Sequence, residues 1–127
     1  MGHVYVKLVL SNPADSQLTA AVDALVDTGA TSTVVPRVLA DRLQLPVIGR
    51  LTVRTATGDV DLDNSGAVVQ INGRRAFNPI LISDTIDKTL VGVITLEALG
   101  LSVDPKGRQL KEAEVLLYGV KDSGGPI

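Results

Sequence analysis

Residues 24–31 read Ala-Leu-Val-Asp-Thr-Gly-Ala-Thr, an acidic turn that follows directly on an apolar run. The β-branched residues Thr33–Val35 resume a strand-like pattern just after the turn. Gly29 carries no Cβ atom, so the backbone can turn sharply beside the Asp27 carboxylate. The pattern predicts an acid group held rigidly at the edge of a hydrophobic core, and the triplet Asp-Thr-Gly occurs once in the chain.

The composition predicts one small, strand-rich domain. The chain has 127 residues, of which 45% are hydrophobic and only 2% aromatic. A core made of Val, Leu, Ile and Ala favours strands, and 127 residues are enough for one domain. We expect this domain to span residues 1–120, with the polar, Gly-rich residues 121–127 as a flexible tail.

Charge and residue usage make several function classes unlikely. The chain has 12 Lys and Arg and 14 Asp and Glu, without long runs of either sign. We therefore expect neither a nucleic-acid nor a membrane partner. The chain has no Cys and one His, so we expect no metal site, and we expect no cofactor. The residues at the start do not form a basic region followed by a long apolar stretch, which is the pattern of a secretory signal. A cytoplasmic location is therefore the default expectation.

Hydrophobic periodicity and turn residues predict the order of elements. Pro36 is expected at the first position of a helix that has Val38, Leu39 and Leu43 on one apolar face and ends by Leu45. Thr95 is expected to cap a second short helix that Gly100 closes. The predicted strands are 4–10, 17–26, 33–35, 51–54, 60–63, 67–71, 74–82, 90–94, 101–104 and 115–118, with turns at 57–59, at Asn72-Gly73 and at 105–107. This pattern indicates a mainly antiparallel, barrel-like β domain.

Two separated blocks, residues 24–31 and 90–101, together resemble the retropepsin-like aspartic proteases. In that family a catalytic Asp-Thr/Ser-Gly is followed some sixty residues later by two apolar residues, a Gly and a short helix. Residues 73–76 and 99–104 look closest to the small bacterial single-domain members. The resemblance implies a closed antiparallel β-barrel with one or two short helices and an active site on the two-fold axis of a homodimer.

The resemblance also implies an aspartic endopeptidase in which each subunit supplies Asp27. Two facing carboxylates share one proton, so that one acts as general base on a water molecule while the other polarises the scissile carbonyl. Thr28 would hydrogen-bond across the axis, and Gly29 would let the backbone approach closely. A peptide substrate would contact Leu25, Ala30 and the tip of a flap formed by residues 51–63, at Thr57, Gly58 and Asp59.

Three positions depart from the commoner family patterns. Ala30 offers no hydroxyl to the ionised carboxylate, so we expect activity at mildly acidic rather than strongly acidic pH. Thr31 and Val93 stand where many viral enzymes have an Asp and an Arg. Because both ends of that ion pair are missing, the dimer must be secured by other edges, and residues 4–10 and 101–118 are available for this.

Two other interpretations remain open from the sequence. The chain could be a protease-like dimeric binding or assembly module that does not turn over peptides, or an ordinary β-barrel interaction domain with an accidental motif. The other carboxylates we considered, Asp15, Asp23, Asp41 and Asp104, are interpreted as surface or turn residues.

Overall fold

A computed structural model describes residues 3–104, 106 and 109–112. Within these residues there are nine strands and two short helices. The strands are β1 (Val4–Asn12), β2 (Asp15–Val26), β3 (Thr33–Pro36), β4 (Gly49–Thr55), β5 (Gly58–Ile71), β6 (Arg74–Ser83), β7 (Thr89–Val91), β8 (Leu101–Asp104) and β9 (Gln109–Glu112). The helices are α1 (Arg37–Arg42) and α2 (Val93–Ala98).

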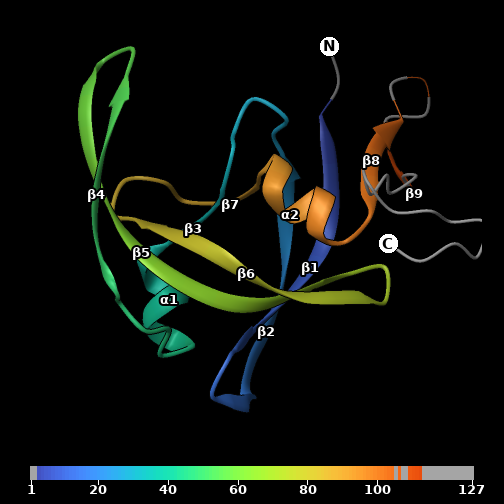
Figure 1. The fold of residues 1–127 in the computed structure, drawn as a ribbon, viewed down its shortest axis with the longest axis horizontal. Coiled ribbons are helices and arrows are strands. Elements are labelled where there is room, and N and C mark those ends of the chain that lie inside the picture. The colour runs from blue at the N-terminus through green and yellow to red at the C-terminus, as the bar shows by residue number, and fades with distance from the viewer. Residues whose placement is uncertain (1–2, 105, 107–108, 113–127) are drawn as a thin grey trace, which may run out of the picture.

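Seven strands form one curled sheet in the order β1-β2-β7-β3-β6-β5-β4. β1 also pairs with β5 through residues 9–11, so the first strand of the sheet returns to its sixth (Figure 1). Most pairings are antiparallel, as predicted. However, β2 runs parallel to β7 and β3 runs parallel to β6, so the sheet is mixed.

Aliphatic side chains fill the interior of the curled sheet, as the low aromatic content predicted. Burying each such side chain stabilises the fold by about 1.5–3 kcal/mol. The largest fully buried apolar residues are Leu8, Leu10, Val35, Leu43, Val69, Ile71, Ile80, Ile82 and Val91.

Helix α1 differs from its prediction in two respects. Pro36 is the extended residue before the helix and not its first helical residue. Leu39 and Leu43 are buried, but Val38, which was expected on the same apolar face, is 80% exposed. The end of the helix is held by Asn12, whose Nδ2 donates to the carbonyls of Leu43 at 2.9 Å and Gln44 at 2.8 Å. Carbonyls at a helix end have no partner within the helix, and this side chain supplies one.

The β7–α2 segment turns earlier than predicted. The expected strand over 90–94 ends at Val91, and the helix starts at Val93 because Gly92 is its extended N-cap residue. Thr95 therefore lies inside the helix, and its predicted capping role was wrong. Gly100, with φ of 66°, follows the helix in the left-handed conformation, as predicted for its end.

The hairpin between β5 and β6 has the predicted turn, because Asn72 and Gly73 both have positive φ. The two strands expected at 60–63 and 67–71 are instead one strand, β5, of 14 residues. At the other end of β5 the turn is Ala56-Thr57, one residue before the predicted 57–59, and Gly58 with φ of 128° begins the strand.

The predicted strand at 101–104 is β8. It pairs antiparallel with β9 (Gln109–Glu112), a strand that was not predicted. The predicted strand at 115–118 and the predicted tail at 121–127 lie outside the described residues.

Candidate active site

The Asp27 loop connects β2 to β3, and β7 lies between these two strands in the sheet. Because β7 lies between β2 and β3, residues 91–94 are close enough to hydrogen-bond to the backbone of the Asp27 loop. The backbone N–H of Asp27 donates to the carbonyl of Val91, that of Val93 to the carbonyl of Ala30, and that of Ile94 to the carbonyl of Thr31, each at 2.9 Å. Three non-local backbone hydrogen bonds thus fix both ends of the Asp-Thr-Gly turn. The two sequence blocks, 24–31 and 90–101, are in direct contact.

The Asp27 carboxylate is oriented by its own turn. The Gly29 N–H donates to Asp27 Oδ1 at 2.9 Å, and the Ala30 N–H donates to the Asp27 carbonyl at 3.0 Å. A Cβ atom on Gly29 would lie 3.2 Å from the same Oδ1, so glycine allows this close approach. Asp27 is half-buried, whereas Thr28 and Gly29 are exposed. The exposed turn leaves Thr28 accessible to a second molecule.

Gly92 lies against the backbone beyond the turn. A Cβ atom at this position would come within 2.5 Å of the carbonyl carbon and oxygen of Ser32. A side chain of any size would therefore push apart the two segments that hold Asp27.

Two buried threonines join the strand after the turn to helix α2. The hydroxyls of Thr33 and Thr95 are 2.6 Å apart, and Thr33 Oγ1 also accepts the N–H of Gly92 at 3.1 Å. Both residues are fully buried, so this pair satisfies polar groups that would otherwise be costly. Sequence reasoning missed the pair, although a threonine at each of two apolar positions was a weak signal for it.

The other predicted site residues lie on two elements. Leu25 is half-buried in β2, opposite Tyr5 and Leu90, and Ala30 is half-buried in the turn. Thr57, Gly58 and Asp59 are exposed at the tip of the β4–β5 hairpin. That tip and the Asp27 loop project toward the same side of the molecule, the top of Figure 1.

Residues 49–62 of β4 and β5 form a two-stranded arm with two unlike faces. On one face, directly opposed residues form polar pairs: Thr52 Oγ1 donates to Asp61 at 2.8 Å, and Arg54 lies 3.6 Å from Asp59. Successive residues of a strand point to opposite faces. The other face is therefore apolar, with Leu51 opposite Leu62 and Val53 opposite Val60.

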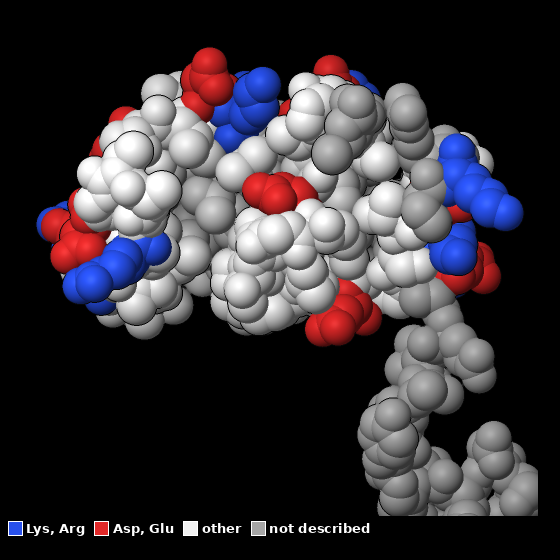
Figure 2. Space-filling model, turned by 90° about the horizontal axis from the view of Figure 1, so that it is seen from above, with Lys and Arg blue, Asp and Glu red and all other residues white. Residues whose placement is uncertain are grey.

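Charged groups of both signs lie on the face of the molecule that Figure 2 shows. Figure 2 views the molecule from the side to which the Asp27 loop and the arm tip project, and acidic and basic side chains are scattered there among uncharged surface. The described residues contain no group of three or more His, Cys, Asp or Glu side chains that could hold a metal ion. No helix among them is long and apolar enough to cross a bilayer.

The pKa values that clearly depart from normal belong to a cluster that the sequence analysis did not single out. Hydrogen bonds to Asp84 and Asp63 raise the pKa of Arg37. In turn, the Arg37 guanidinium holds the pKa of Asp63 and that of Asp84 below their usual values, against an opposing effect of desolvation. These residues come from well-separated parts of the chain, so sequence spacing gave no signal for their contact.

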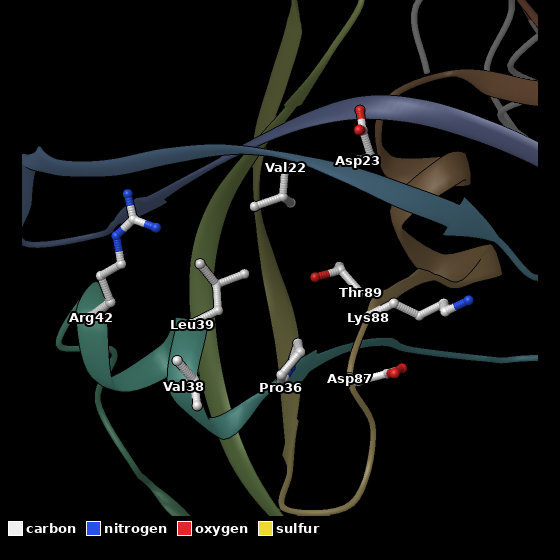
Figure 3. A pocket seen from close by; sticks show the side chains of 9 residues that line it. All are labelled: Val22, Asp23, Pro36, Val38, Leu39, Arg42, Asp87, Lys88 and Thr89. Atoms are coloured by element: carbon white, nitrogen blue, oxygen red, sulfur yellow. The ribbon is translucent and has the colours of Figure 1, made fainter.

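A cavity of about 290 Å³ lies between α1, β2 and the segment before β7. Figure 3 shows apolar side chains such as Val22 and Leu39 on its wall, with Arg42 and Lys88 at its edges. None of its lining residues belongs to the 24–31 block, so it is separate from the predicted catalytic turn.

The Asp-Thr-Gly turn connects β2 to β3, and β7 lies between these two strands in the sheet. A turn of this sequence in this position is typical of an aspartic-protease fold. The chain belongs to the family described as gag-polyprotein putative aspartyl protease, whose family model matches residues 19–98. The matched range includes Asp27 and most of the second block.

A solved structure has a similar fold. The structure of EIAV protease complexed with the inhibitor HBY-793 matches with a TM-score of 0.64 and 19% sequence identity, over 91% of this chain and 94% of that chain. No curated protein matches by sequence. The predicted retropepsin-like family is therefore confirmed, and the closer likeness to bacterial members stays a prediction.

Proposed function

We propose that the protein is an aspartic endopeptidase that works as a homodimer, with Asp27 of each subunit forming the catalytic pair. The observation that carries this proposal is the Asp27 turn itself. Its backbone is bonded to the 91–94 segment on both sides, and its carboxylate accepts the Gly29 N–H. A rigid, half-buried acid on an exposed turn is suited to face an identical acid across a two-fold axis.

The chemistry needs only the two carboxylates and water. The ionised Asp27 removes a proton from a water molecule, which attacks the scissile carbonyl carbon, while the protonated Asp27 donates a hydrogen bond to the carbonyl oxygen. The Asp27 that took the proton from water then delivers it to the amide nitrogen. The tetrahedral intermediate collapses, the C–N bond breaks and the amine leaves. Thr28 hydrogen-bonds across the axis and keeps the two turns in register.

The substrate is an extended peptide that lies between the catalytic pair and the arm. The apolar face of the arm, with Leu51 and Val53, suits apolar side chains of such a peptide. Leu25 and Ala30 contribute from the turn side, and Thr57, Gly58 and Asp59 close over the peptide from the tip. Activity is expected at mildly acidic pH, because Ala30 has no hydroxyl to stabilise the ionised carboxylate.

Asp27→Asn replaces the proposed catalytic carboxylate with an amide. An amide cannot act as the general base, so cleavage of a peptide library at about pH 4 to 7 should fall at least about 100-fold. The matched control is Asp23→Asn, which alters an exposed carboxylate four residues earlier that pairs with Lys7. It should keep wild-type activity, and both variants should keep the wild-type Tm and the dimeric mass in light scattering.

Equal cleavage by wild type and Asp27→Asn would remove Asp27 from the mechanism. A folded, dimeric wild-type protein that cleaves nothing in the library would favour the alternative, a protease-like dimeric binding or assembly module. A monomer at all accessible concentrations would contradict both.

A further inference from the structure

The base of the arm is a defined point in the sheet. Among the described residues, Gly58–Leu62 of β5 pair with β4 alone, whereas the later residues 65–71 pair with β6. Asp63 and Asn64 belong to both ladders, and Asp63, opposite Arg50 on one side and Ile82 on the other, is the one nearer the tip of the arm. The two-stranded arm therefore leaves the main sheet at Asp63.

A cluster of ion pairs is centred on this residue. Arg37 Nη2 lies 2.6 Å from Asp63 Oδ2, and Arg50 Nε lies 3.3 Å from Asp63 Oδ1. Arg37 also binds Asp84, with Nε 2.8 Å from Oδ1. The cluster thus joins both strands of the arm to the first residue of α1 and to the segment that follows β6.

Burial makes the pairs at Asp63 different from those farther along the arm. The Asp63 side chain is only 9% exposed, whereas those of Arg54 and Asp59 are 89% and 58% exposed. Exposed ion pairs contribute little, but a buried carboxylate that loses its partner is strongly unfavourable. Asp63 therefore resists separation from Arg37, and the outer pairs do not hold the arm in place.

We propose that the Arg37–Asp63–Arg50 cluster is the hinge anchor of the arm, and that Asp63 is a positioning residue that sets how much of the time the arm is closed. The structural part of this inference stands alone, while its kinetic consequence rests on the proposed function. Loss of the anchor lets the arm detach from α1 at its base. The closed fraction falls, and apparent substrate affinity falls with it.

The structural test is amide hydrogen exchange of the intact protein, read separately for the arm and for the main sheet. Asp63→Asn should speed exchange in residues 49–62 at least about threefold and leave residues 66–71 and 74–82 unchanged. Arg50→Gln, which removes the more exposed partner, should act in the same direction with a smaller effect. Lys7→Gln, which breaks the exposed pair with Asp23 on β1 and β2, is the control and should change neither region.

The result that would overturn the hinge anchor is unchanged exchange in the arm, or equal acceleration in the arm and the main sheet for both variants. If Asp63→Asn does not fold, Arg50→Gln alone decides between these outcomes.

The kinetic test uses the peptide substrate. Asp63→Asn should raise KM at least about threefold with little change in kcat, because saturating substrate restores the closed arm. A fall in kcat at unchanged KM would contradict a positioning role. If the wild type proves inactive on peptides, the exchange test still stands, so failure of the hinge and failure of the proposed function are distinguishable.

Discussion

Gly92 shows how strongly one residue can depend on a distant segment of the chain. It contributes no side chain to the site. It does let β7 and α2 approach the Ser32 backbone so closely that the backbone of residues 91–94 hydrogen-bonds to the Asp27 turn. The glycine is needed for close packing rather than for a positive φ, because the residue is extended.

We expect Gly92→Ala to destabilise the protein by about 1–3 kcal/mol or more. The new methyl group would overlap the Ser32 backbone, which cannot move aside as a side chain does by changing its rotamer. Urea unfolding measures this change. Gly49→Ala is the matched control, since its Cβ atom would meet only Asn64 Nδ2 at 3.9 Å. Equal stability of the two variants would contradict the tight fit between Gly92 and Ser32.

At the scale of elements, two hydroxyl groups join β3 to α2. The short helix has no side-chain cap and only six residues, so its position relies on packing and on the Thr33–Thr95 bond. Because the helix begins where the 93–94 backbone binds the Asp27 turn, its placement also fixes the turn.

We expect Thr95→Val to cost about 1–3 kcal/mol, because it leaves the buried Thr33 hydroxyl without this partner. Thr33→Val should cost more, since it also removes the acceptor for the Gly92 N–H. Urea unfolding of the two variants, which change the side chain in the same way, measures the difference. If Thr95→Val were the more damaging of the two, the bond to Gly92 would not contribute as inferred.

At the scale of the whole molecule, the ion pairs of Arg37 with Asp63 and Asp84 make the free energy of unfolding depend on pH. This cluster of ion pairs links α1, the arm and the segment after β6, which are separate in the chain and adjacent in the fold. Arg37 lowers the pKa of Asp63 and of Asp84 from the ordinary value of 3.8, so both carboxylates bind protons more weakly in the folded protein than in the unfolded chain. Their contribution is complete above pH 3.8 and is lost as the pH falls through the lower folded pKa values.

We therefore expect wild type to be more stable than Asp63→Asn by a constant margin between about pH 5 and 7, and the margin to shrink below pH 3.8. Thermal unfolding across this range measures the margin. A margin that did not change on acidification would mean that the charge of Asp63 contributes nothing. The mildly acidic range proposed for activity lies above this transition, so the hinge anchor would be intact there.

Local patterns were enough to predict most elements, because they depend on neighbouring residues. Alternating apolar residues indicated the strands, Asn72-Gly73 indicated its turn, and Asp27 with Gly29 indicated an acid on a tight turn. Two of the errors lie at distant contacts: Thr95 has the chemistry of a cap but lies in the core, bonded to Thr33, and Gly92, the N-cap residue of α2, packs against the Ser32 backbone.

The tertiary structure alone decided which distant segments meet. It placed β7 between β2 and β3, which gave the Asp27 turn its backbone partners, and it brought Arg37, Asp63 and Asp84 together. No spacing along the chain encodes such contacts, because they depend on how the strands are ordered in the sheet. Side-chain periodicity can say which face of a strand is buried, but it does not say which strand lies beside it.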